Sequence, residues 1–138
     1  MPGAPVEALQ RVPLFSELSR GEVEQVARLF KKRAFKAGET VAREGSGGGA
    51  FYLIDSGDAV VSVAGKERRT LGPGDYFGEI ALIDEGARSA TVTAVTELRC
   101  HGLTYWDFRP VVQGNAEISW KLLQSVVKNL RDEQAARE

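Results

Sequence analysis

The chain has 138 residues, of which 43% are hydrophobic and 27% are charged, a composition ordinary for one globular domain with its own core. Its 18 basic and 19 acidic side chains leave a formal net charge of −1, without the strongly basic face that binding to nucleic acid requires. No apolar run approaches the roughly 20 residues of a membrane helix, and the first residues lack a signal-peptide pattern. We therefore expect a cytoplasmic protein that binds neither membranes nor nucleic acid directly.

The first element with a clear pattern lies near the N-terminus. Residues 19–22, Ser-Arg-Gly-Glu, have capping-box spacing, and Val23, Val26 and Phe30 then recur on one helical face. This pattern predicts a helix over about 20–32, preceded by a helical lead-in. The basic cluster Arg28–Arg33 is interpreted as the solvated end of that helix, where cations favour the helix dipole.

From about residue 34 to about residue 103 the pattern changes to short β-rich runs separated by glycine-containing turns. Several short strands at this spacing are typical of a sandwich or a small barrel. The single Cys100 and the single His101 fall in the last of these runs and are interpreted as ordinary strand residues. The predicted strands are 40–43, 50–54, 59–63, 68–71, 90–94 and 98–103.

The last part of the chain predicts helices again. Thr104 can cap a short helical turn, and Asn115 can cap a longer helix that runs to about Glu133. Two interpretations of that helix's apolar stripe stay open: burial against the β-rich segment, or pairing with a second copy of the chain. The stripe consists of Ile118, Leu122, Val126 and Leu130.

The segment between residues 78 and 89 carries the residues suited to bind an anion. Gly78 opens a short apolar turn, Ile80–Ile83, whose first amide groups lack helical partners and attract negative charge. Arg88, after a tight Gly86-Ala87 turn, supplies a fork of donors that can hold two phosphate oxygens, and Ser89 adds a hydroxyl.

Glu79 would repel a phosphate, but its carboxylate can accept a hydrogen bond from a sugar hydroxyl. Together with the anion-binding residues, it predicts a site for a nucleoside monophosphate. The alternative is a surface salt bridge between Glu79 and Arg88, which would contribute only about 0–1 kcal/mol.

The runs Phe77–Leu82 and Arg88–Thr91 resemble the phosphate-binding cassette of cyclic nucleotide-binding domains. Such domains occur in protein kinase A regulatory subunits, cyclic-nucleotide-gated channels and the catabolite activator protein family. Leu14–Ser19, Gly38–Gly57 and Leu103–Phe108 are similar to other motifs of the family, so the resemblance covers about residues 10–132.

The resemblance implies a mainly β fold with flanking α-helices, an eight-stranded β-roll of the jelly-roll type, in a single domain over residues 1–138. N-terminal helices would occupy about 5–32 and the roll about 34–103, with a short helix in the cassette. A hinge and the long C-terminal helix would occupy about 104–135.

The resemblance also implies roles for individual residues. Glu79 would bind the ribose 2′-hydroxyl, Arg88 the exocyclic phosphate oxygens, and Ser89 a phosphate oxygen. Ser89 also favours cAMP over cGMP, because family members that prefer cGMP often have Thr there. Backbone amides near Gly78, Ile80, Ala81 and Ala90 would complete the phosphate site, and Val61, Val63 and Leu71 would form the wall for the base. The candidates to cover the base from the last helix are Trp120, Leu123, Val127, Leu130, Glu133 and Gln134.

The expected function is regulatory: binding of the nucleotide repositions the C-terminal helix, which acts on an effector that the sequence does not name or pairs with a second copy. An enzyme is not expected, since no serine has a histidine near it in the sequence and one histidine is too few for the metal site of a related β-barrel enzyme. No metal or cofactor is expected. The alternative is a ligand-free domain of the same fold that serves only for protein contact, against which the intact Glu79 and Arg88 argue.

Overall fold

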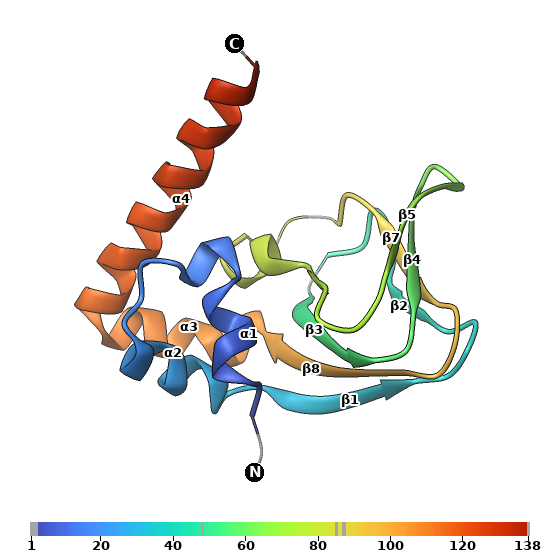
Figure 1. Cartoon of the computed structure of the whole chain (residues 1–138), viewed down its shortest axis with the longest axis horizontal. Helices are drawn as coiled ribbons and strands as arrows, with labels where there is room; N and C mark the ends of the chain where they lie inside the picture. Colours follow the sequence, from blue (N-terminus) through green and yellow to red (C-terminus); the bar gives the residue numbers. More distant parts are fainter. Residues whose placement is uncertain (1–2, 48, 85, 87, 138) are drawn as a thin grey trace.

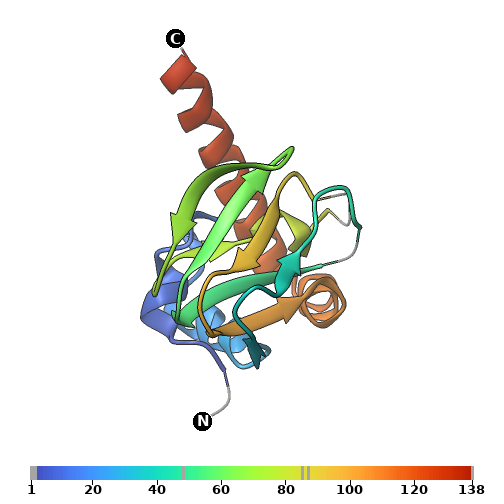
Figure 2. The same ribbon diagram turned by 90° about the vertical axis from the view of Figure 1, so that its right-hand side faces the viewer.

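The computed structural model describes residues 3–47, 49–84, 86 and 88–137. Within them, eight strands form two four-stranded antiparallel sheets that face each other, with helices at one end (Figures 1 and 2). The predicted eight-stranded β-roll with flanking helices is confirmed. In spatial order, sheet A comprises β1 (Lys31–Phe35), β8 (Leu98–Thr104), β3 (Ala50–Ser56) and β6 (Tyr76–Phe77). Sheet B comprises β2 (Thr40–Ala42), β7 (Thr91–Ala94), β4 (Ala59–Val63) and β5 (Lys66–Leu71).

The helices precede the roll, follow it and interrupt it once. None of those in the described part of the chain is long and apolar enough to span a membrane. They are α1 (Val6–Gln10), the 3₁₀ helix η1 (Pro13–Phe15), α2 (Arg20–Ala27), the 3₁₀ helix η2 (Glu79–Leu82), α3 (Tyr105–Gly114) and α4 (Ala116–Arg137).

Sheet A separates two hydrophobic cores. Along β3, Phe51 and Leu53 belong to the core shared with the helices, whereas Tyr52 and Ile54 belong to the core between the two sheets. Successive side chains of a strand point to opposite faces, so a strand covered on both faces needs an unbroken apolar run. This is why residues 50–54 show no alternation of polar and apolar positions.

The predicted N-terminal helix is only partly correct. The capping box is confirmed: the Glu22 amide donates to Ser19 Oγ over 3.3 Å, and the Ser19 amide donates to Glu22 Oε1 over 2.8 Å. However, α2 ends at Ala27 rather than near residue 32, and Lys31–Phe35 forms β1. The interpretation of Arg28–Arg33 as a helix end is therefore wrong, because hydrogen bonding to β8 takes these residues into sheet A as its edge strand.

Both predicted caps of the C-terminal helices are confirmed. Thr104 Oγ1 accepts a hydrogen bond from the Asp107 amide over 3.1 Å, and Asn115 Oδ1 accepts one from the Ile118 amide over 3.0 Å. The helices are longer than expected: α3 has ten residues instead of a single turn, and α4 continues to Arg137.

The apolar stripe of α4 divides between two environments. Ile118 and Leu122 are buried, but Val126 and Leu130 are exposed, and Ser125 occupies the next buried position. Residues four apart drift by about 40° around a helix, so a ladder of such steps leaves the contact face after two turns. The buried part of α4 packs on η1 and α3, in the core that these helices share with β3 and β8, and the rest projects from the molecule (Figure 1). Burial of the stripe is therefore confirmed for Ile118 and Leu122 and wrong for Val126 and Leu130.

Candidate functional site

A cavity of about 590 Å³ lies between the inner face of sheet B and the segment formed by β6, η2 and the loop that follows. Nine of the residues that the sequence assigned to the phosphate, the ribose and the wall for the base line it, although they come from four separate strands and loops. Val63, the third predicted wall residue, does not line it. The assigned residues are Val61, Leu71, Gly78, Glu79, Ile80, Ala81, Arg88, Ser89 and Ala90.

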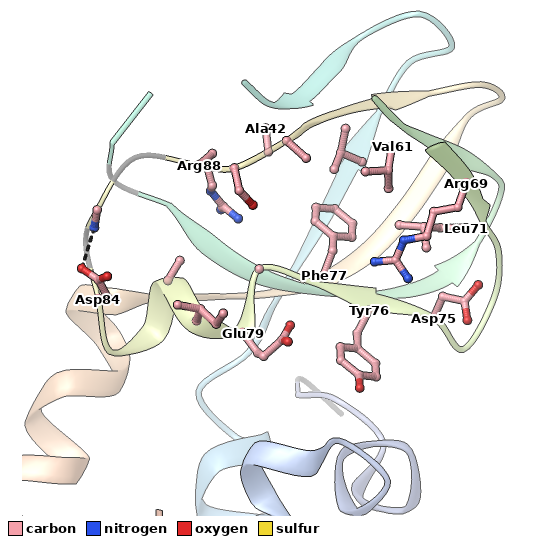
Figure 3. A pocket seen from close by; sticks show the side chains of 17 residues that line it. Ala42, Val61, Arg69, Leu71, Asp75, Tyr76, Phe77, Glu79, Asp84 and Arg88 are labelled. Carbon is pink, nitrogen blue, oxygen red and sulfur yellow. Dashed lines mark hydrogen bonds between the residues drawn. The ribbon is translucent and has the colours of Figure 1, made fainter. Parts of the chain in front are cut away.

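Arg88 is held at one end of the cavity by three hydrogen bonds. Its amide donates to the Ser46 carbonyl oxygen and its carbonyl oxygen accepts from the Gly45 amide, both over 2.9 Å. Its Nη2 atom donates to the carbonyl oxygen of Ala50 over 2.7 Å. The backbone and the guanidinium are thus both anchored, and the side chain points into the cavity (Figure 3).

Two glycines make room for this guanidinium. A Cβ atom at position 78 would lie 2.5 Å from Arg88 Nη1 and 2.6 Å from the Ala50 carbonyl oxygen, and one at position 49 would lie 2.5 Å from Arg88 Nη2. Gly78 also has a φ of 85°, which other residues adopt only with strain. Position 78 therefore requires glycine for both its conformation and its contacts.

The positive charge of Arg88 has no counter-charge in the part of the chain that the structure describes. None of the ion pairs among those residues includes Arg88 or Glu79, so the predicted alternative, a salt bridge between these two, does not form. Burial lowers the pKa of Arg88, since desolvation disfavours its charged form. An anion in the cavity would remove that penalty.

The predicted apolar turn at Ile80–Ile83 is the 3₁₀ helix η2, with Gly78 as its N-cap. The first amides of such a helix have no partners within it. Its apolar side chains differ in solvent exposure: Ala81 and Leu82 are buried, whereas Ile80 is 71% exposed. The predicted Gly86-Ala87 turn falls partly outside the described residues, at Ala87; the Gly86 amide donates to Asp84 Oδ1 over 3.0 Å.

Glu79 extends from η2 beside Tyr76 (Figure 3). Burial raises the pKa of the Tyr76 hydroxyl, and the Glu79 carboxylate raises it further. Tyr76 therefore stays neutral at any physiological pH. The cavity accordingly combines a cation at Arg88 with a carboxylate at Glu79, the two groups that the sequence assigned to a phosphate and a sugar hydroxyl.

The other end of the cavity holds a second cation that the sequence analysis missed. Arg69 lies across the cavity from Arg88, beyond Val61 and Phe77 (Figure 3). Arg69 precedes Leu71 by two positions on β5 and so shares its face, which was the available signal. The remaining lining residues that were not predicted are Ala42, Asp75, Tyr76, Phe77, Asp84, Gly86 and Val92.

The candidates for covering the base do not reach the cavity. Trp120, Leu123, Val127 and Leu130 lie on α4 and are exposed, and neither they nor residues 133–134 line it. Thr91 and Thr93 do not line the cavity either, whereas Val92 between them does.

Fold and cavity together define a class: β-roll domains that enclose a ligand cavity between sheet B and a short helix. Residues 32–115 match the family described as "Cyclic nucleotide-binding domain". This match covers more than half of the chain, and the chain belongs to that family.

Relatives and solved structures agree with this assignment. The chain is 42% identical over 93 residues to the cAMP-dependent protein kinase regulatory subunit of Yarrowia lipolytica, covering 66% of this chain and 25% of that protein. It is 32% identical over 125 residues to the cyclic AMP receptor protein of Thermus thermophilus, covering 87% and 58%. The chain thus corresponds to only a part of each relative. The crystal structure of the N-terminal domain of a transcriptional regulator from Streptomyces coelicolor superposes with a TM-score of 0.82 at 27% identity, covering 95% of both chains.

Proposed function

We propose that this domain binds a 3′,5′-cyclic nucleotide in the cavity at Arg88 and acts as a regulatory sensor. The observation that supports this most is the half-buried guanidinium of Arg88, which faces the cavity without a carboxylate partner among the described residues. A cyclic phosphodiester is an anion at any physiological pH, and bidentate hydrogen bonds from arginine suit its two exocyclic oxygens. The family membership of the chain agrees with this ligand.

In this proposal the nucleotide lies along the cavity from Arg88 to Arg69. Arg88, Ser89 and backbone amides near Gly78, Ile80 and Ala90 hold the phosphate, and Glu79 accepts a hydrogen bond from the ribose 2′-hydroxyl. The Ala81 amide, also assigned to the phosphate from the sequence, donates to the Gly78 carbonyl oxygen over 3.0 Å. The base lies on the apolar surface of Val61 and Leu71.

We propose that the preferred ligand is cAMP, because serine at position 89 resembles the cAMP-binding form of the cassette. The second candidate ligand is cGMP, favoured by Arg69 at the base end of the cavity. Guanine presents two acceptors, O6 and N7, that an arginine can bind together, whereas adenine presents a donor beside its N7. Arg69 is therefore the residue whose substitution distinguishes the two ligands.

The signal would travel to α4 through contacts that already connect it to the cavity. Arg88 bonds the Ala50 carbonyl oxygen, and the adjacent Phe51 ring lies 6.0 Å from the ring of Phe15 in η1. η1 in turn packs against α4. We propose that the ligand pulls the cassette inward and shifts α4 between two positions, one of which covers the base. The exposed part of α4 would then contact an effector or a second copy.

Isothermal titration with cAMP, cGMP and 5′-AMP tests this function. We expect saturable binding of a cyclic nucleotide and none of 5′-AMP. Arg88→Ala should weaken binding at least about 30-fold, as expected for removing one partner of a buried charge pair. Arg68→Ala, next to Arg69 on the same strand but outside the cavity, is the matched control and should bind like the parent chain.

Arg69→Ala completes the design. It should weaken cGMP more than cAMP if Arg69 contacts guanine, and should affect both alike if it does not. No heat from any of the three nucleotides would reject the proposal in favour of a ligand-free domain that serves only for protein contact.

A further inference from the structure

A second, smaller cavity lies on sheet A, where β1, β8 and β3 adjoin. Its volume is about 180 Å³, and it shares no lining residue with the cavity at Arg88. It forms beside an irregularity in the ladder: β3 and β8 change register between Ile54 and Ser56, and Asp55 is left without a paired residue. Such bulges redirect side chains and are frequent next to functional sites.

The charges around this cavity are mainly positive, although the chain as a whole is not. Lys32, Arg33 and Arg99 line it, against the single carboxylate of Asp55. The Arg33 side chain lies on the Tyr52 face of sheet A, so Lys32 and Arg99 are the cations on the face of His101. Among the described residues, Lys32 and Arg33 have no carboxylate partner within 4.0 Å. Arg99 is paired only with Glu97, over 3.4 Å, in a contact where both side chains are largely exposed and which is easily exchanged.

The remaining polar group of the cavity is His101, opposite Lys32 on β1 and Leu53 on β3. Its side chain lines the cavity, and the residue is 9% exposed. Its Nδ1 atom is buried and has no hydrogen-bond partner among the described residues. Buried polar groups in folded proteins nearly always have a partner, so an unpartnered one indicates a missing ligand or water.

Cations on β1 alone would have a simpler explanation, since β1 is the edge of sheet A and charged side chains on an edge strand discourage pairing with other chains. That explanation accounts for neither the cavity nor the buried imidazole. It also does not account for Arg99, which lies on the inner strand β8.

We propose that this cavity is a second binding site, specific for a small oxyanion such as a phosphate or a carboxylate. Lys32 and Arg99 supply the positive charge, and His101, on the same face of sheet A, adjoins the ligand at the bottom of the site. This site is independent of nucleotide binding at Arg88.

His101 is the only histidine of the chain, so its imidazole signals in an NMR spectrum need no assignment. The test is to follow them in the full chain while inorganic phosphate, and separately succinate, replaces chloride at constant ionic strength and pH. The Arg88→Ala variant is used in parallel so that phosphate in the first cavity cannot contribute.

We expect a saturable shift of the His101 signals in both proteins. The anion with the higher affinity, phosphate or succinate, identifies the kind of oxyanion that the site takes. The double variant Lys32→Gln/Arg99→Gln should bind at least tenfold more weakly. The double variant Lys66→Gln/Arg68→Gln removes the same charge from exposed positions of β5 and should bind like the parent chain. A response that does not saturate with either anion, or one that the Lys32→Gln/Arg99→Gln variant retains, would overturn the proposal.

Discussion

The side chain most constrained by its surroundings is that of Arg88, whose position depends on glycine at residue 78. A methyl group there would lie 2.5 Å from Nη1 and 2.6 Å from the Ala50 carbonyl oxygen, which itself accepts a hydrogen bond from Arg88. Because the carbonyl belongs to the backbone of β3, it cannot move aside as a flexible side chain could. A side chain at residue 78 would therefore push the backbone of this segment away from β3 and displace the guanidinium from its present position.

We predict that Gly78→Ala destabilises the domain by roughly 1–3 kcal/mol, because alanine at a positive φ is strained, and abolishes most of the nucleotide affinity. Urea unfolding and isothermal titration measure the two effects. Gly21→Ala is the control: nothing lies within 4 Å of its Cβ, and it lies inside α2, where alanine favours the helix by up to about 1 kcal/mol. If Gly78→Ala kept full affinity, the placement of Arg88 would be wrong.

The residues of the cavity differ in how far the sequence could predict them. Gly78, Glu79, Arg88 and Ser89 lie within one short segment, so their order and spacing were enough to bring them together. Arg69 lies outside that segment, on β5, and the only local signal for it was its position two residues before Leu71, which gives both side chains the same face. Its place opposite Val61 depends on the register of the β4–β5 hairpin, which shifts between Val61 and Ser62 in a way that no local pattern shows.

At the level of elements, helix ends were predicted best because capping is local. The Ser19, Thr104 and Asn115 caps each depend on a hydrogen bond to a residue three positions away. β1 was missed for the opposite reason: its sequence, Lys-Lys-Arg-Ala-Phe, is strand only because β8 is beside it. Likewise the two residues of β6 form a strand through their pairing with Tyr52 and Leu53.

One ion pair fixes α4 to the N-terminal helices. Lys121 Nζ lies 2.8 Å from Glu22 Oε1, and both side chains are largely buried. The hydrogen bond from Lys121 lowers the pKa of Glu22, as does the one from the Ser19 amide. This pair adds to the packing of Ile118 and Leu122, the apolar residues of α4 that are buried in the core.

We predict that Glu22→Gln loosens α4 while leaving α2 intact, since glutamine also serves in a capping box. The expected loss is about 1 kcal/mol, measured by urea unfolding, together with faster amide exchange over residues 116–130. Glu117→Gln is the control, because Glu117 is exposed and 3.8 Å from the same Lys121. Equal effects of the two variants would show that the pair with Glu22 has no special role.

The pair also gives a pH dependence of known sign. Because the pKa of Glu22 is lowered in the folded state, its contribution is complete above the ordinary value of 4.5 and is lost as the pH falls below it towards the folded-state pKa. Unfolding curves at falling pH should therefore show the parent chain and Glu22→Gln converging in stability. A constant difference down to complete acid unfolding would contradict this.

At the scale of the whole molecule, the half of α4 that projects from it exposes a row of apolar side chains. Trp120, Leu123, Val127 and Leu130 are exposed there at intervals of three, four and three residues, the spacing at which two helices pack together in a coiled coil. The seam is only two heptads long, so pairing with a second copy should be weak and dependent on concentration. The same side chains are the candidates to cover the nucleotide base.

We predict that the chain forms dimers reversibly in sedimentation experiments and that Leu123→Lys/Leu130→Lys weakens this association at least tenfold. Gln124→Lys, on a neighbouring exposed position of the same helix, should leave it unchanged. A helix that folds over the ligand withdraws these side chains from a partner copy. Saturating cAMP should therefore lower the dimer association constant of the parent chain. Because binding linkage is reciprocal, dimerisation should lower the affinity for cAMP by the same factor. If the chain stays monomeric at every concentration, the exposed stripe does not pair with a second copy and is available to an effector. If dimerisation does not change with cAMP, α4 does not move over the cavity.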